Sequence, residues 1–325
     1  MASGLDLTAL TDFINEQKHA QDIYTRAINK NDSSPWLVQL GMNKHKMALP
    51  NVDSDRGNIQ DGAGELGTAD FKGQVIASQS VLVGASLAYW TKMQARDLEN
   101  FYTNVSLPAG QDYQPEALSA LDSAILNKII ATISGDLEKL IWQGDLAGAT
   151  STFLDLADGF IVQAEAAVTG AVLSKTSSGA ITQANARDVV DGLVDAAMAD
   201  EDFAPLMSES GKAYILTGHD VVRAYAQQYR ADFGALPYNT SFNKPLVDGT
   251  EVMLIGVSGL TGQDTAFLTR NDNFVQGHDV IGEERSMDVG LDQFEEFIWI
   301  KDRFKHGVIA RDMTDNSVFY HASVV

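Results

Sequence analysis

Apolar residues recur every three or four positions over residues 115–142, and this is the most regular hydrophobic pattern in the chain. Leucine or isoleucine occupies positions 118, 121, 125, 129, 133, 137, 140 and 141. Such spacing places these side chains on one face of a helix. At about 1.5 Å per residue the helix would be roughly 40 Å long, well beyond the globular average. The pattern therefore predicts one long helix that begins at Pro115 and is ended by Gly144.

The pattern is weaker on the N-terminal side of that helix. Residues 5–28 have apolar positions at mostly helical spacing, which predicts an amphipathic helix, either a tethering arm or a helix packed on its own domain. Residues 51–73 are rich in Gly, Asp and Asn and predict a long exposed loop. Short β-prone runs at 74–77 and 80–83 follow it, and an alternating run at 89–96 comes next. A loop between extended arms predicts a projecting flap.

Strands and helices alternate in the second half of the chain. The residues after Thr182 predict a helix, and residues 213–217, 220–229 and 251–257 predict a strand, a helix and a buried strand. Residues 294–320 return to β structure. The apolar face of the helix after Thr182 consists of Ala186, Val189, Val190, Leu193, Val194 and Ala197. This alternation indicates an α/β or α+β module followed by a closing β segment.

The composition is that of a globular, cysteine-free and acidic protein. Of 325 residues, 45% are hydrophobic and 21% are charged, which is enough apolar material for a sizeable core. The absence of cysteine excludes disulfides, cysteine-ligated metals and thiol catalysis. No signal-peptide pattern and no stretch of about 18 apolar residues occurs, so we expect synthesis in a cytoplasm and no membrane contact.

Charge is distributed unevenly. The formal net charge is -21, from 23 Lys and Arg against 44 Asp and Glu. Phosphate binding needs clustered Lys and Arg, so we do not expect the surface as a whole to bind nucleic acid. A local basic patch is still compatible with a net charge of -21. Residues 1–50 carry five basic and five acidic side chains and form a separate electrostatic zone.

Several motifs match part of a known site signature, but the residues around them do not fit that kind of site. Residues 62–67 spell G-x-G-x-x-G, yet no hydrophobic strand leads into them and residues 71–73 break any helix after them, which disfavours nucleotide binding. Asp53 and Asp55 lack the glycine and glutamate that a calcium loop needs. His278 beside Asp279 is expected in a surface turn.

The remaining polar clusters also favour a structural role. The six histidines are scattered, with no metal-ligand spacing, and no G-x-S-x-G elbow occurs. His219 and Asp220 most simply begin a helix. Residues 200–202, an acidic run, are expected in a solvated loop. We therefore predict no catalytic, cofactor-binding or metal-binding residue, no cofactor, and no enzymatic activity.

The order of these parts is informative as a whole. The predicted long helix ends in Trp-Gln-Gly-Asp at 142–145, a Gly-Phe step follows at 159–160, and the runs 271–279 and 297–308 come later. In this order the chain resembles the HK97-fold major capsid proteins of tailed bacteriophages. The resemblance covers nearly the whole chain and rests on architecture, since no single motif in it is as specific as a metal-ligand signature.

The resemblance implies an α+β fold with named parts. These would be an N-terminal arm at 1–50, an extended β E-loop at 51–95, a peripheral domain at 96–160 with its spine helix at about 115–142, an α/β axial domain at 161–294, and return strands of the peripheral domain at 295–325.

The resemblance also implies a function. Subunits would self-assemble into pentamers and hexamers that form an icosahedral head around double-stranded DNA, without sequence-specific binding. A separate scaffold, a portal and decoration proteins are possible partners, and the location would be the virion after synthesis in the host cytoplasm. A covalent crosslink from Lys72 to Asn271 or Asn273 of a neighbour is disfavoured, because no activating pattern surrounds them.

Two alternatives stay open at this point. One is the shell protein of an encapsulin-like nanocompartment, which shares the capsid fold without a phage. The other belongs to a different class, an acidic soluble enzyme without a recognisable motif. Particle mass separates a shell protein from an enzyme, and particle contents separate the two kinds of shell.

Overall fold

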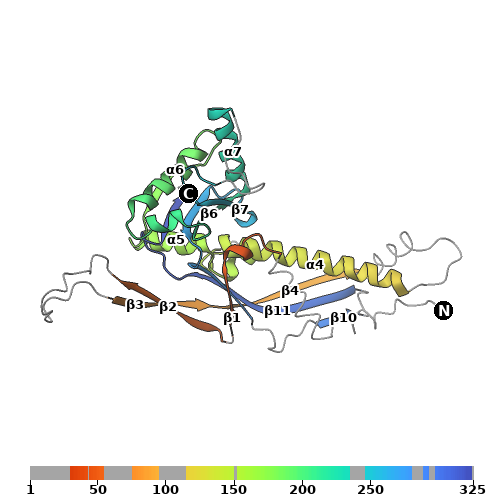
Figure 1. Cartoon of the computed structure of the whole chain (residues 1–325). Coiled ribbons are helices and arrows are strands. Elements are labelled where there is room, and N and C mark those ends of the chain that lie inside the picture. The colour runs from red at the N-terminus through yellow and green to blue at the C-terminus, as the bar shows by residue number, and fades with distance from the viewer. Residues whose placement is uncertain are drawn as a thin grey trace, which may run out of the picture.

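The computed structural model describes residues 30–42, 44–54, 75–94, 115–149, 152–234, 246–279, 288–292 and 297–323. The described residues form a long lower body with a lobe rising from it (Figure 1). The strands are β1 (Val38–Met42), β2 (Lys46–Ser54), β3 (Val75–Val83), β4 (Ala85–Gln94), β5 (Lys175–Ser178), β6 (Ala213–Gly218), β7 (Met253–Val257), β8 (Thr265–Arg270), β9 (Phe274–Asp279), β10 (Asp288–Asp292), β11 (Phe297–Ala310) and β12 (Val318–Ala322). The helices are α4 (Pro115–Gln143), α5 (Phe160–Thr169), α6 (Ala186–Ala199) and α7 (His219–Phe233), with short 3-10 helices η1 (Ser34–Trp36), η2 (Phe153–Leu156), η3 (Ala204–Ser208) and η4 (Ser258–Leu260).

Strand β11 organises the sheet of the lower body. It runs antiparallel to β4 along one edge, and β10 and β9 share its other edge. Strand β1 then pairs in parallel with β9. Burial alternates along β11, because successive side chains of a strand point to opposite faces. Ile300, Asp302, Phe304 and His306 are buried, whereas Trp299, Lys301, Arg303 and Lys305 are not.

The sheet of the lobe has the order β5-β12-β8-β6-β7. All six residues of β6 are buried, as expected for a central strand covered on both faces. On one side, α6 and α7 enclose a cluster that includes Leu193, Tyr225 and Leu268. On the other side, the lobe sheet packs against α5 and the end of α4 through a cluster that includes Trp142 and Phe267. The mixed architecture confirms the predicted α+β class.

Helix α4 confirms the predicted long helix. It has 29 residues and so extends about 44 Å along the lower sheet (Figure 1). Its C-terminal half buries Ile129, Ile133, Leu137 and Ile141. The predicted face of α6 is confirmed as well, since all six of its apolar residues are buried. Thr182 was expected to cap this helix, but the N-cap is Asn185 and the helix begins at Ala186, because Thr182 and Asn185 form a hydrogen-bonded turn before it.

The flap region differs from the prediction at its edges. Residues 51–54, expected in a loop, continue strand β2, and the two β-prone runs after the loop form one strand, β3. Pairing with β3 over nine positions outweighs the poor strand propensity of Pro50, Asn51 and Asp53. The predicted helix at 5–28 and the centre of the flap at 55–74 lie outside the described residues.

The closing segment divides between the two sheets. Strand β11 belongs to the lower sheet, but β12 pairs with β8 and β5 in the lobe. Strand β4 likewise joins β11 in the lower sheet. The division into arm, E-loop, peripheral and axial domains therefore remains a proposal, in which β12 is counted with the lobe and β4 with the lower body.

Candidate assembly surfaces

The hairpin of β2 and β3 projects from the body (Figure 1). Its two strands pair from Lys46 opposite Val83 to Ser54 opposite Val75, and no third strand among the described residues joins them. A two-stranded ribbon has little stability of its own in water. Its outer edges also leave backbone hydrogen-bonding groups without a strand partner.

One face of this hairpin carries an apolar stripe. Alternate residues of β3 share the stripe, and Val75, Val81 and Val83 are 68%, 42% and 46% exposed. Opposite Val81 and Val83 on β2 lie Ala48 and Lys46, both exposed. Ala77 and Gln79 lie between Val75 and Val81 on this face, so the stripe has one polar interruption. Exposed apolar groups on a projecting ribbon are typical of a surface that binds another protein.

The base of the hairpin is fixed to the body. Leu49 and Leu82 are buried against Met42 of β1 and Val275 of β9. Gly277 permits this approach, since a Cβ there would lie 2.5 Å from Leu82 Cδ2. The Ser80 hydroxyl also donates a 2.7 Å hydrogen bond to the carbonyl of Arg311. The hairpin is therefore held in a defined direction at its base while its stripe stays exposed.

A second feature is the junction of the N-terminal segment with α4. The Ser33 hydroxyl donates a hydrogen bond to the buried carboxylate of Glu138. Trp142 Nε1–H donates to Ser33 Oγ at 2.7 Å. Burial raises the pKa of Glu138, and the hydrogen bonds from Ser33 oppose that rise. Residues 31–34 are thereby attached to the middle of the molecule.

Two glycines bring the lobe onto the same end of α4. A Cβ at Gly259 of η4 would lie 2.4 Å from both the Glu138 carbonyl oxygen and Trp142 Cδ1. A Cβ at Gly159 would lie 2.6 Å from the Trp142 carbonyl oxygen. The Gln143 side chain adds a hydrogen bond to the Gly259 carbonyl. The Trp-Gln-Gly-Asp ending and the Gly-Phe step thus meet at one close-packed junction.

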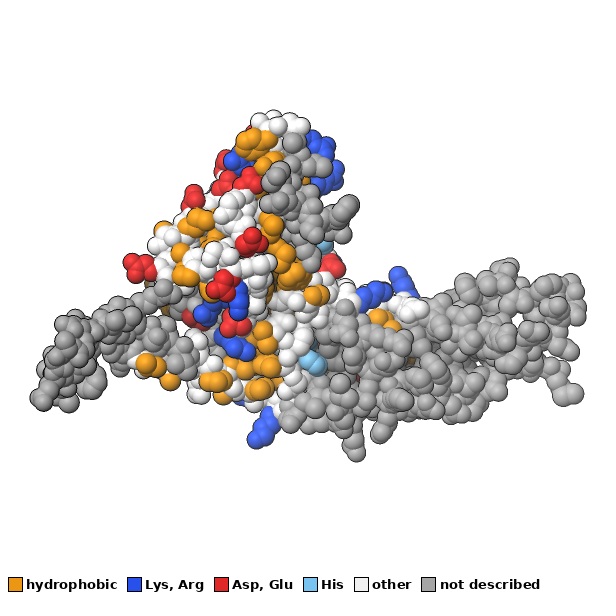
Figure 2. All heavy atoms as spheres, viewed as in Figure 1, with side chains coloured by type: hydrophobic (Ala, Val, Ile, Leu, Met, Phe, Trp, Pro, Cys, Tyr) orange, Lys and Arg blue, Asp and Glu red, His pale blue; other side chains and the backbone are white. Residues whose placement is uncertain are grey.

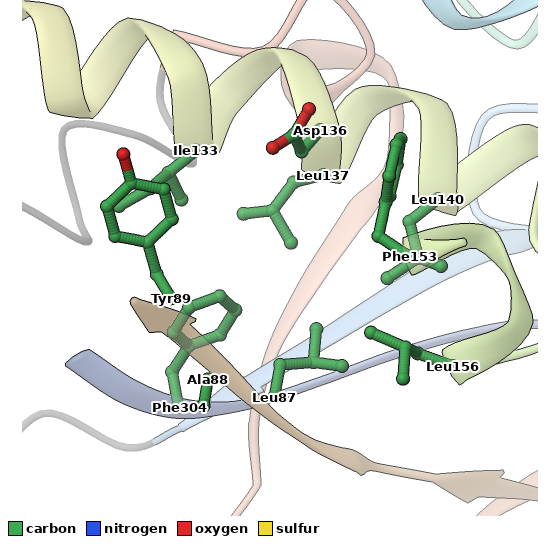
Figure 3. A pocket seen from close by; sticks show the side chains of 10 residues that line it. All are labelled: Leu87, Ala88, Tyr89, Ile133, Asp136, Leu137, Leu140, Phe153, Leu156 and Phe304. Atoms are coloured by element: carbon green, nitrogen blue, oxygen red, sulfur yellow. The ribbon is translucent and has the colours of Figure 1, made fainter. Parts of the chain in front are cut away.

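An apolar pocket lies between α4 and the lower sheet (Figure 3). Its cavity volume is about 80 Å³. Side chains from α4, β4, β11 and η2 line it, namely Ile133, Asp136, Leu137, Leu140, Leu87, Ala88, Tyr89, Phe304, Phe153 and Leu156. Asp136 is the one charged group in this lining, and so the pocket offers apolar contact and no set of convergent catalytic groups.

A chain of polar side chains crosses the lower sheet from exposed Gln39 on β1 to buried Gln276 and His306 on β9 and β11. Gln39 Nε2 donates to Gln276 Oε1 at 2.9 Å, and Gln276 Nε2 lies 2.9 Å from His306 Nε2. Because an amide nitrogen only donates, this imidazole nitrogen accepts and His306 is neutral. Burial, and then the neighbouring His278, lowers the pKa of His306 to about 4.

The structure also places the polar residues considered from the sequence. His278 lies in β9, in register with His306 of β11. The prediction that His278 lies in a surface turn was therefore wrong. Helix α7 does begin at His219, with Gly218 as its N-cap. Asn273 is buried, and its side chain bonds Thr269 and the backbone of Asp312. The motif at 62–67 and Lys72 lie outside the described residues.

Acidic side chains are spread over the lobe, where they are seen in Figure 2. Within the described ranges, no three His, Asp or Glu residues are arranged to hold a metal ion. None of the described helices is long and apolar enough to cross a membrane.

Comparison with known proteins gives a clear structural result. No protein-family model and no curated protein matches the sequence. The satellite phage P4 procapsid structure is similar at a TM-score of 0.56 and 12% identity, covering 94% of this chain and 99% of that chain. The cyanophage A-1(L) capsid is similar at 0.56 and 11%, covering 88% and 90%. The capsid of an empty GTA particle is similar at 0.53 and 11%, covering 91% and 90%.

These structures span nearly all of the chain, so the likeness extends over both the lower body and the lobe. At such low identities the likeness is one of fold. The chain has the fold of phage capsid structures, which confirms at the level of the fold the resemblance seen in its sequence.

Proposed function

We propose that this protein is the major subunit of an icosahedral phage head, and that it self-assembles into pentamers and hexamers around double-stranded DNA. The observation that carries the proposal is the projecting β2–β3 hairpin with its exposed valines. The similarity of the fold to phage capsid structures supports it. A ribbon fixed at its base and apolar on one face is suited to lie across a neighbouring subunit.

In this proposal the parts have the roles that the HK97-type architecture implies. The hairpin corresponds to the E-loop, α4 to the spine helix of the peripheral domain, and the lobe to the axial domain around which capsomers close. A separate scaffold, a portal and decoration proteins would complete the particle. The subunit has a structural role and no enzymatic one, and its location would be the virion after synthesis in the host cytoplasm.

Assembly of the purified chain tests the proposal. Light scattering and electron microscopy are expected to find megadalton icosahedral particles. The double variant Val75→Asp and Val81→Asp should reduce particle yield at least ten-fold while the subunit keeps its melting temperature. The matched control, Val172→Asp with Met198→Asp, alters two lobe residues that are 51% and 46% exposed and should assemble as the unaltered chain does.

A monodisperse monomer or dimer under every condition would contradict the proposal. Normal assembly of the hairpin variant would leave a shell protein but remove the hairpin from its interfaces. Particles that contain a protein cargo and no DNA would favour the nanocompartment alternative.

A further inference from the structure

One face of the β4–β11 ladder combines cations and aromatic rings in a chain that is otherwise strongly acidic. Residues paired across an antiparallel ladder share a face. Trp90 is in register with Lys301, Lys92 with Trp299, Ala88 with Arg303 and Ser86 with Lys305. Four of the 23 Lys and Arg residues therefore lie on one short face, although the chain has a net charge of -21.

This face is open among the residues that the structure describes. Helix α4 packs on the opposite face, where Leu87 and Phe304 meet Leu137. On the cationic face, Trp90 is 72% exposed, and Lys92 and Arg303 are exposed as well. The face is bounded by the hairpin at Gly307, where a Cβ would lie 2.3 Å from the Val83 carbonyl oxygen.

The aromatic rings hold the cations in place. Lys301 Nζ lies 5.6 Å from the centre of the Trp90 ring, and Lys92 Nζ lies 5.1 Å from that of Phe297. Such contacts orient an ammonium group without neutralising it. Strand β10 places Asp288 and Asp292 in register with Lys301 and Phe297, so two acidic positions accompany the four basic ones.

We propose that this face of the β4–β11 ladder, with Lys92, Lys301, Arg303, Lys305 and Trp90, binds the sugar-phosphate backbone of nucleic acid enclosed by the shell. Side chains two residues apart on a strand are about 7 Å apart, so Lys301 to Lys305 span about 13 Å. That length matches about four phosphates along one strand of a duplex. Exposed Trp90 adds a ring on which an unpaired base can stack.

The inference rests on the proposed function and requires that this face line the interior of the shell. The remaining surface, with its acidic excess, repels the same polyanion. Contact is thereby confined to a small patch on each subunit and repeated over the shell. Binding by one subunit is then weak and strongly dependent on salt.

Fluorescence anisotropy of the full chain with labelled DNA of about 20 nucleotides, single-stranded and duplex, tests the inference. The double variant Lys301→Gln with Arg303→Gln should bind at least ten-fold more weakly at low salt. Its log–log salt slope should be smaller in magnitude by about 2. The matched control, Lys128→Gln with Lys139→Gln, removes two exposed lysines of α4 and should bind like the unaltered chain.

The Trp90→Ala variant distinguishes the two kinds of nucleic acid. Loss of stacking should weaken single-stranded binding about ten-fold and leave duplex binding nearly unchanged. An equal effect on both probes would assign the face to the backbone alone.

Three results would overturn the inference. The first is that neither DNA probe binds at low salt. The second is that the control variant loses as much DNA affinity as the Lys301→Gln, Arg303→Gln variant. The third is that the Lys301→Gln, Arg303→Gln variant binds DNA normally but no longer forms particles. The last would assign the face to a neighbouring subunit. Particle formation is scored separately by electron microscopy, so DNA binding at this face without any particles would contradict the proposed function and not the binding site.

Discussion

The Ser33 hydroxyl donates a hydrogen bond to the Glu138 carboxylate although 105 positions separate the two residues in the chain. The same Ser33 oxygen accepts the Trp142 indole N–H at 2.7 Å. One hydroxyl therefore satisfies a buried acid and a buried indole, and it attaches the N-terminal segment to α4.

Replacing Ser33 with Ala should destabilise the protein by about 2 kcal/mol, because Glu138 and Trp142 each lose a partner inside the core. Urea unfolding followed by tryptophan fluorescence measures the change. Ser208→Ala, at an exposed position, serves as the control and should change stability by less than about 0.5 kcal/mol. Equal effects of the two substitutions would show that the Ser33 contacts contribute nothing.

Glu138 should also make stability depend on pH. Its pKa is raised from 4.5 by burial, so the folded state binds this proton more tightly than the unfolded state does. The stabilising contribution of the bound proton is complete below pH 4.5 and is lost as pH rises through the higher folded pKa. The Glu138→Gln variant should therefore gain stability relative to the unaltered chain between pH 4.5 and pH 7. A constant difference over that range would argue against a raised pKa.

His306 should change the pH dependence of stability in the opposite direction to Glu138. Its folded pKa of about 4 lies below the ordinary 6.5, so its contribution is complete above pH 6.5 and is lost as pH falls toward 4. The full loss corresponds to about 3 kcal/mol. The His306→Gln variant should lose less stability than the unaltered chain on acidification over this range, whereas His45→Gln at an exposed position should behave like the unaltered chain.

Two glycine substitutions should have opposite effects. Gly259→Ala places a methyl group 2.4 Å from the Glu138 carbonyl oxygen and should cost about 3 kcal/mol. Gly135 lies inside α4 with no atom within 4 Å of an added Cβ, so Gly135→Ala should stabilise by about 1 kcal/mol. Thermal unfolding of both variants measures the difference, and an unchanged melting temperature for Gly259→Ala would contradict the close contact.

Local patterns predicted the helices well. The periodic isoleucines and leucines located α4 to within a residue, and all six apolar positions of α6 proved buried. Strand β2 was not predicted over any of its length, and a loop was expected at 51–54, because Pro50 and its polar neighbours disfavour a strand and only pairing with β3 reveals it. The contact of Ser33 with Glu138 has no local signal, since it joins a loop to a helix far along the chain.

The cationic face did have a signal that was overlooked. It is the alternation of Trp299, Lys301, Arg303 and Lys305, which overlaps the continuous apolar run at 297–300. With period two, these side chains must share one face of a strand. Which face stays open depends on where α4 packs, and sequence spacing does not contain that information.

The position of β12 has a consequence for the order of events during synthesis. Val318–Ala322 lies between β5 and β8, and Tyr320 stacks on Phe267 with ring centres 4.8 Å apart. A nascent chain that has not yet reached residue 318 cannot close the lobe sheet, and it leaves that aromatic surface in water. The five-stranded lobe sheet can therefore be completed only after the last residues of β12 have been synthesised, and folding of this part of the lobe is post-translational.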